Sequence, residues 1–206
     1  MDVGLAWRGA VFGVAIAAPV GPIAVLLIRR TLTRGRAVGF ASGLGAATAD
    51  LTYGLVVALG LTAVTDRLVS AERGLQAVGG LVLLALGIRT IRSAPAPAEA
   101  ADTSRRSLAA AYASTYALTL TNPATIVLFL AVFASIGVVA TSGSSGDALT
   151  IATGVAVGSA AWQLSLCTAV SLLRGRLTDS RVRWVNITSG LVIAGFGVAA
   201  LAAAAS

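Results

Sequence analysis

The sequence predicts an all-α integral membrane protein in which six transmembrane helices form two inverted repeats of three helices each. Three observations support this fold class: a very apolar composition, six long apolar blocks, and an internal repeat. Hydrophobic residues make up 57% of the 206-residue chain and charged residues only 11%, whereas a soluble domain carries about 25% charged residues. The mean hydropathy of +0.90 agrees with a chain that has no sizeable soluble domain.

The apolar residues fall into six blocks, and a helix needs about 20 apolar residues to cross a bilayer. Membrane β-strands would be shorter and would alternate apolar with polar residues, so these blocks predict helices. The first block is not expected to be a cleaved signal peptide, because its apolar run continues far beyond the candidate cleavage site. The blocks are Ala10–Ile28, Ala37–Leu61, Leu75–Ile91, Leu108–Ile136, Leu149–Leu173 and Trp184–Leu201.

Arginine placement predicts the orientation of these helices. All 15 positive residues are arginines, and the loops after the first, third and fifth blocks carry most of them. Positively charged loops stay in the cytoplasm, so we expect a bacterial cytoplasmic (inner) membrane protein with both termini outside. The net charge of +7 then faces anionic lipid, and we expect no nucleic-acid partner. The loop arginines are Arg29, Arg30, Arg34, Arg36, Arg89, Arg92, Arg105, Arg106, Arg174, Arg176, Arg181 and Arg183.

Three pairs of segments match in the same order and reveal the internal repeat. Each half then holds three spans, and an odd number of spans inverts the second half, as in secondary transporters with midplane binding sites. We therefore divide the chain into a first repeat (1–92), a cytoplasmic linker (93–107) and a second repeat (108–206). The matches are Val20–Ile28 with Thr121–Phe129, Ala41–Leu51 with Ala152–Trp162, and Gly79–Ile88 with Ser189–Val198.

Prolines occupy equivalent places in the first and fourth blocks. Pro19 and Pro22 flank Gly21 in the first block, and Asn122 precedes Pro123 in the fourth. Proline removes a backbone donor and collides with the preceding helical turn, so both places are candidates for a broken helix that lines a cavity. The helical N-terminus after each break would suit a substrate carboxylate. A simple proline kink is the alternative reading.

Asp50 is the acidic residue that lies well inside an apolar block. A charged Asp at the centre of a membrane helix costs about 2.5–3.5 kcal/mol on the milder scales, so it must face a wet cavity, face a partner, or be protonated. The functional interpretation is proton coupling, contact with a substrate ammonium, or both. A structural hydrogen bond is the alternative. Tyr53 shares this helix face and is either a group that orients Asp50 or a packing residue.

Other motifs are structural. Glycines recur every four residues at Gly9 and Gly13 and at Gly154 and Gly158. This spacing permits close helix packing, either within the chain or at a homodimer face. The chain has no His and a single Cys, so the sequence predicts no metal site, and no motif predicts a cofactor. We do not expect an enzyme, because an intramembrane aspartyl protease would need two membrane carboxylates.

The segments "APVGPIAVLLIRRTLTRGRAVGFASGLGAATADLTYG" and "TLTNPATI", with the glycine-bearing last block, resemble the lysine exporter (LysE-type) amino-acid translocators. The Pro19–Pro22 turn, Asp50 and the Asn122–Pro123 pair carry the resemblance. A related branch of exporters reads Pro-Gly-Pro and Asn-Pro-Lys, whereas Val20 splits the first motif here and Ala124 replaces the Lys. These departures concern the substrate more than the fold.

The resemblance implies proton-driven export of amino acids or close derivatives. We expect an antiporter that works by alternating access, with the substrate carboxylate near Pro22 and Pro123. The substrate ammonium would meet Asp50 or the backbone carbonyls freed around Gly21 and Asn122. Two alternatives stay open: a metal or inorganic-ion transporter on the same plan, and a membrane scaffold that transports nothing.

Overall fold

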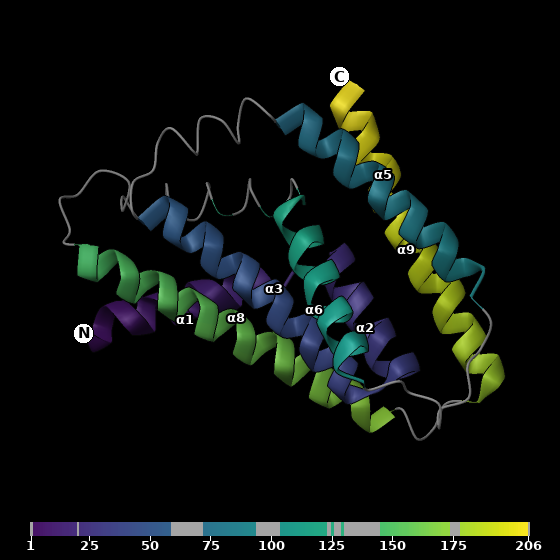
Figure 1. The fold of residues 1–206 in the computed structure, drawn as a ribbon, viewed down its shortest axis with the longest axis horizontal. Coiled ribbons are helices and arrows are strands. Elements are labelled where there is room, and N and C mark those ends of the chain that lie inside the picture. The colour runs from purple at the N-terminus through teal and green to yellow at the C-terminus, as the bar shows by residue number, and fades with distance from the viewer. Residues whose placement is uncertain are drawn as a thin grey trace.

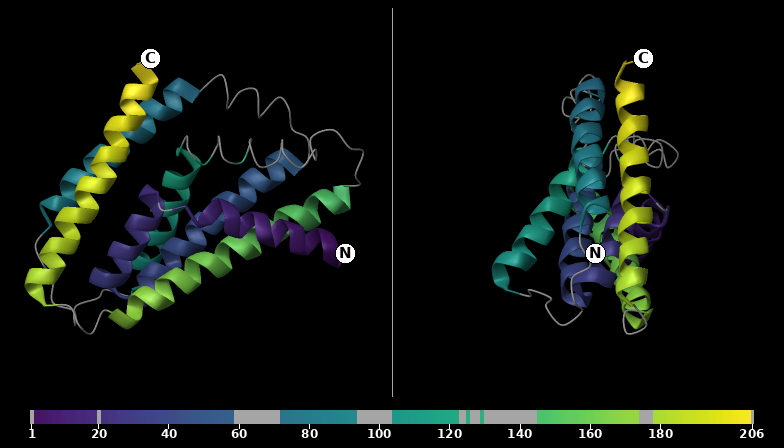
Figure 2. Two further views of the ribbon diagram at one scale, coloured as in Figure 1. Left: turned by 180° about the vertical axis from the view of Figure 1, so that it is seen from behind. Right: turned by 90° about the vertical axis from the view of Figure 1, so that its right-hand side faces the viewer.

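The structure is a computed structural model, and it describes residues 2–19, 21–58, 72–93, 104–122, 125, 129, 145–173 and 178–205. The described residues are almost entirely helical (Figure 1). The helices are α1 (Val3–Ala17), α2 (Pro22–Arg34), α3 (Arg36–Ala58), α5 (Glu72–Ile91), α6 (Arg105–Leu120), α8 (Ser145–Leu173) and α9 (Asp179–Ala205). The centre is α3, which packs against α8 and α6, while α1 packs along α8. The α5 and α9 helices pair with each other and meet the rest through α2 (Figure 2).

Among the residues that the structure describes, three helices are long and apolar enough to cross a bilayer, and the bent pair α1 and α2 would make a fourth as one span. The three are Arg73–Ile91, Leu149–Leu173 and Ser180–Ala205, which overlap the third, fifth and sixth predicted blocks. The second block forms the single helix α3, and the fourth begins as α6. Much of the fourth block lies outside the described residues, so the six-span inverted repeat remains a prediction.

The break predicted in the first block is present. The α1 helix ends at Ala17, α2 begins at Pro22, and the two axes are bent by 81°. Proline at the first helical position costs no hydrogen bond, because the backbone N–H of that residue would have no partner within the helix. At the other end of α2, Gly35 has a φ of 94°, which glycine adopts without strain and which lets α3 begin one residue later.

The arginines after the first block do not lie in a loop, contrary to the sequence analysis. The α2 helix continues to Arg34, and α3 begins at Arg36, so Gly35 alone separates the two helices. The apolar run ends at Ile28, but the helix continues to Arg34. Its polar last turns are stabilised because α2 packs against α3 and α6. As a result, Arg30 is only 8% exposed.

The predicted linker at 93–107 lies largely outside the described residues, which resume at 104. Of this linker, the structure describes Ser93 after α5, Ser104, and the first residues of α6, which begins at Arg105. Ser104 caps this helix, because its hydroxyl accepts a hydrogen bond of 3.2 Å from the backbone N–H of Ser107. The division into two repeats and a linker stays a prediction.

Glycines bring α1 and α8 into backbone contact. A Cβ atom built on Gly9 would lie 3.0 Å from Gly154 Cα, and one on Gly13 would lie 2.8 Å from Ser159 N. On the facing helix, a Cβ on Gly158 would lie 2.8 Å from Ala10 Cα. Small residues at four-residue spacing permit this approach. These glycines therefore serve packing within the chain.

The α5 and α9 helices also meet through glycines. Gly80 faces Gly197, with 2.9 Å from a built Cβ to the facing carbonyl oxygen, and Gly87 faces Gly190 at 2.7 Å. The residue numbers rise along one helix as they fall along the other, so the two helices are antiparallel (Figure 1). Their backbones touch at two points along the pair.

The apolar core is centred on α2. Leu26 and Leu27 are 1% and 0% exposed, and they pack in one cluster with Ala46 of α3, Cys167 of α8 and Ile193 of α9. The short α2 helix is thus surrounded by longer ones. Its N-terminus, at the break, lies inside the molecule and opens onto the site described next.

Candidate functional site

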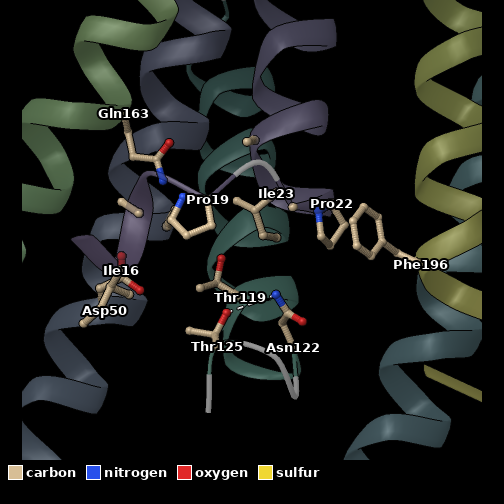
Figure 3. A pocket seen from close by; sticks show the side chains of 14 residues that line it. Ile16, Pro19, Pro22, Ile23, Asp50, Thr119, Asn122, Thr125, Gln163 and Phe196 are labelled. Carbon is tan, nitrogen blue, oxygen red and sulfur yellow. Dashed lines mark hydrogen bonds between the residues drawn. The ribbon is translucent and has the colours of Figure 1, made fainter. Parts of the chain in front are cut away.

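A cavity of about 270 Å³ lies at the break between α1 and α2 (Figure 3). Its wall combines the break with residues from α3, the end of α6, α8 and α9. Apolar side chains form much of it, with a few polar groups among them. The lining residues are Ile16, Ala17, Pro19, Gly21, Pro22, Ile23, Ala24, Ala46, Asp50, Thr119, Asn122, Thr125, Gln163 and Phe196.

The N-terminus of α2 forms one side of the cavity. Gly21 is extended, with φ −107° and ψ −170°, and no side chain caps the helix. A hydrogen bond of 2.9 Å from Gly21 N–H to the Pro19 carbonyl closes the turn before it. The first N–H groups of a helix have no partner within it and carry partial positive charge. The first turn of α2, which includes Ile23 and Ala24, can therefore receive an anionic group.

Asp50 forms another side, on α3. Its side chain is 3% exposed, and the hydroxyl of Ser159 on α8 donates a hydrogen bond of 2.6 Å to Oδ2. Hydroxyl donors to a carboxylate form short, charge-assisted bonds when the acid is ionised. Asp50 thus has both a structural partner and a place in the cavity wall, and the functional and structural interpretations of this residue are compatible.

The end of α6 supplies the third side. The carbonyls of the last helical turn carry partial negative charge, and here Tyr53, Thr121 and Asn122 donate hydrogen bonds to them. Asn122 follows this end, and its side-chain N–H donates a hydrogen bond of 3.0 Å to Thr125 Oγ1 (Figure 3). The residue before a proline is disfavoured in the helical conformation, which explains why α6 stops just ahead of Asn122 and Pro123.

Tyr53 lies beside the cavity and is not part of its lining. Its hydroxyl donates a hydrogen bond of 2.5 Å to the carbonyl of Leu120, and its ring packs on Phe129 with 5.3 Å between centroids. The hydroxyl therefore satisfies a carbonyl at the end of α6 and does not bond to Asp50. The three-residue spacing of Asp50 and Tyr53 places both on one face of α3. It does not predict which neighbouring helix the long Tyr53 side chain contacts.

The cavity brings together five of the seven predicted site residues: Pro19, Gly21, Pro22, Asp50 and Asn122. Tyr53 is adjacent, and Pro123 lies outside the described residues. The sequence analysis did not propose several groups that the structure adds to the wall or to Asp50. They are Thr119, Thr125, Ser159, Gln163 and Phe196.

A second polar cluster surrounds Arg30, near the other end of α2. One terminal nitrogen donates to Ser42 Oγ at 2.9 Å, to the Ala111 carbonyl at 3.0 Å and to Thr115 Oγ1 at 2.8 Å. The other donates to Ser114 Oγ at 2.9 Å. These acceptors are neutral oxygens on α3 and α6. A planar guanidinium with several donors can bridge two helices in this way.

The neighbouring arginines extend this network. Arg29 donates to Asn186 Oδ1 on α9 at 3.0 Å and to Ser93 Oγ, just after α5, at 3.1 Å. Arg34 donates to Ser107 Oγ on α6 at 2.9 Å. The polar end of α2 is thus bonded to helices from both halves of the chain.

Comparison with known proteins identifies the family. The family model for the LysE type translocator matches residues 14–204. The chain belongs to this family. It is also similar to a protein of Bacillus subtilis (strain 168) named "Putative amino acid efflux protein YcgF", with 27% identity over 190 residues, which is 91% of this chain and 90% of the relative. No solved structure gives a significant match. The chain is therefore a multi-pass membrane protein of a translocator family.

Proposed function

We propose that this chain is a secondary-active exporter of amino acids or close derivatives, working as a proton-coupled antiporter by alternating access. One observation carries the proposal: the uncapped N-terminus of α2 and the buried carboxyl group of Asp50 line the same cavity. An amino acid has two opposite charges a short distance apart. The site offers a group of the complementary sign for each.

The carboxylate of the substrate binds at the first turn of α2. Backbone N–H groups and the helix dipole both favour an anion there. The ammonium binds on the opposite side, near Asp50 and the carbonyl end of α6. Charge-assisted hydrogen bonds to the ionised carboxyl would fix this end of the substrate. Protonation of Asp50 would weaken its attraction for the ammonium, which is how proton entry releases the substrate in this proposal.

The size of the cavity supports a small solute. Its volume of about 270 Å³ lies at the small end of ligand pockets, which span about 300–1,000 Å³. A site of this size suits a solute as small as an amino acid. Ile16, Ile23 and Phe196 provide an apolar surface for its side chain.

The glycine pairs of α5 and α9 support the inverted repeat. In the internal match, Gly80 corresponds to Gly190 and Gly87 corresponds to Gly197. Exchanging the two halves turns the Gly80–Gly197 contact into the Gly190–Gly87 contact, and both contacts exist. A two-fold axis between the halves would give this pattern. Alternating access is then a rearrangement of one half against the other around the cavity.

The arginine distribution supports an orientation with both termini outside and the polar end of α2 in the cytoplasm. Export is favoured by the name of the Bacillus subtilis relative. A carrier of metal or inorganic ions remains the second candidate in principle. The cavity fits it less well, because Asp50 is its one carboxylate among the described residues and much of its lining is apolar.

The test separates binding from proton coupling in purified protein reconstituted into liposomes. We expect wild type to show both counterflow of labelled amino acids and uphill flux driven by a pH gradient. Asp50→Asn should lose the gradient-driven flux. Asp147→Asn is the matched control, because Asp147 lies in the first turn of α8 and outside the cavity lining. Gradient-driven flux that survives Asp50→Asn unchanged would refute the coupling role.

A further inference from the structure

Two buried polar atoms in the cavity wall have no hydrogen-bond partner: Oγ1 of Thr119 and Oε1 of Gln163. The two side chains are 3% and 4% exposed. Buried polar atoms in native proteins are nearly always paired, so an unpaired one needs an explanation. Both side chains line a cavity large enough for a ligand, while the two unpaired atoms are covered by protein. A rotation of each side chain would turn these atoms toward a ligand that donates hydrogen bonds.

Thr119 differs from most other helical threonines of this chain. A threonine inside a helix usually donates its hydroxyl to the carbonyl four residues earlier. Thr119 makes no such bond, and its side chain points into the cavity beside Asn122 and Thr125 (Figure 3). The threonines that do make this bond are Thr31, Thr33, Thr48, Thr52, Thr115, Thr150, Thr153, Thr168 and Thr188.

Asp50 provides a third acceptor in the same cavity. Ser159 occupies Oδ2, and the carboxyl group has a second oxygen. The three acceptors come from three helices, α3 for Asp50, α6 for Thr119 and α8 for Gln163. They match the three N–H donors of a primary ammonium group. The α2 N-terminus, which receives the carboxylate, lies across the same cavity.

We propose that Gln163 and Thr119 complete, with Asp50, a three-acceptor site that selects a primary ammonium group. They are specificity-determining residues of the translocator, and the substrate class is amino acids with a free primary amine. Proline and N-methyl amino acids carry a secondary amine with two N–H donors. A secondary amine would therefore leave one of the three buried acceptors without a hydrogen bond, and its extra carbon would lie against that acceptor. The inference rests on the proposed function.

The experiment compares competition by a primary and a secondary amine. Full-length protein in liposomes is screened for counterflow with the twenty labelled proteinogenic amino acids. The amino acid that exchanges fastest is then competed with its own unlabelled form and with its N-methyl form. In wild type, we expect the N-methyl form to compete at least about tenfold less well, since sites built to hydrogen-bond a substrate discriminate strongly against analogues that lack the donor.

The variants Gln163→Leu and Thr119→Val remove one acceptor each. We expect competition by the parent amino acid to weaken, while competition by the N-methyl form weakens less, so that the ratio between them contracts. Thr119→Ser should restore the wild-type ratio, since it keeps the hydroxyl. Thr153→Val is the matched control, because Thr153 is exposed on α8 and bonds to its own helix. A purely structural role would weaken both competitors equally.

Two results would overturn the inference while leaving the proposed function intact. One is equal competition by the parent and N-methyl forms in wild type, a measurement that needs no variant to fold. The other is an unchanged ratio in both acceptor variants. If no amino acid exchanges in folded wild-type protein, the proposed function fails, and the inference fails with it.

Discussion

Replacing Gly158 with alanine should loosen the contact between α1 and α8. The added Cβ would meet the Ala10 carbonyl oxygen and would lie 2.7 Å from Ala10 C and 2.8 Å from Ala10 Cα. These are backbone atoms, so the helices must separate by more than about 1 Å to bring the Ala10 carbonyl oxygen back to an ordinary contact distance. Overpacking of this kind costs about 1–3 kcal/mol. Alanine also favours the helix by about 1 kcal/mol relative to glycine, which offsets part of this cost.

Gly195→Ala isolates the clash from the propensity effect. Gly195 is also helical, and a Cβ there would meet nothing within 4 Å. The two variants should therefore differ by about 1–3 kcal/mol, or about 2–12 °C in unfolding midpoint for a chain of this size. The measurement is thermal unfolding of detergent-solubilised protein, with every variant scanned at one rate because unfolding can be irreversible. Equal midpoints for Gly158→Ala and Gly195→Ala would show that α1 and α8 are not in backbone contact.

Two further predictions concern hydrogen bonds made by α2 and α3. Arg30→Lys should lower the free energy of unfolding by about 1–3 kcal/mol, because an ammonium cannot make the hydrogen bonds that the guanidinium makes to both α3 and α6. The control, Arg105→Lys at an exposed position, should change it by less than about 0.5 kcal/mol. Equal effects of the two variants in thermal unfolding would contradict the Arg30 network. Tyr53→Phe should cost about 1 kcal/mol through the lost bond to Leu120 while the ring contact with Phe129 remains. Tyr112→Phe is its control, and a Tyr53 variant as stable as that control would argue against the bond.

The break at Pro19–Pro22 was predictable because it depends on local chemistry. Proline and Gly21 limit what the backbone can do whatever surrounds them. Asp50 was predictable for a similar reason, since the cost of a carboxyl group among apolar residues can be read from its neighbours in sequence. Both features are properties of a short segment, and the structure places both in one cavity wall.

The remaining site residues depend on tertiary contacts. Thr119 and Thr115 look alike in sequence, one turn apart on α6, yet Thr115 bonds to its own helix and to Arg30, while Thr119 faces the cavity. Arg30 was assigned to a loop because the sequence analysis placed every clustered arginine outside the apolar blocks. The packing of the end of α2 against other helices could not be inferred from charge alone. Ser159 had one usable signal, because it occupies the place of Thr48 in the internal match, two residues before the position equivalent to Asp50.

The predicted repeat would be symmetric, but the chemistry of the site is not. The α2 helix begins and the α6 helix ends at the cavity, while the carboxyl group of Asp50 lies on α3 and the unpaired amide oxygen of Gln163 lies on α8. One charged and two neutral acceptors can bind an ammonium while leaving a single group to titrate. Asparagine at position 50 would keep an acceptor oxygen and lose the charge. In Asp50→Asn, substrate exchange should therefore persist with weakened affinity while coupling to protons is lost, whereas the loss of Gln163 or Thr119 should change selectivity and leave coupling in place.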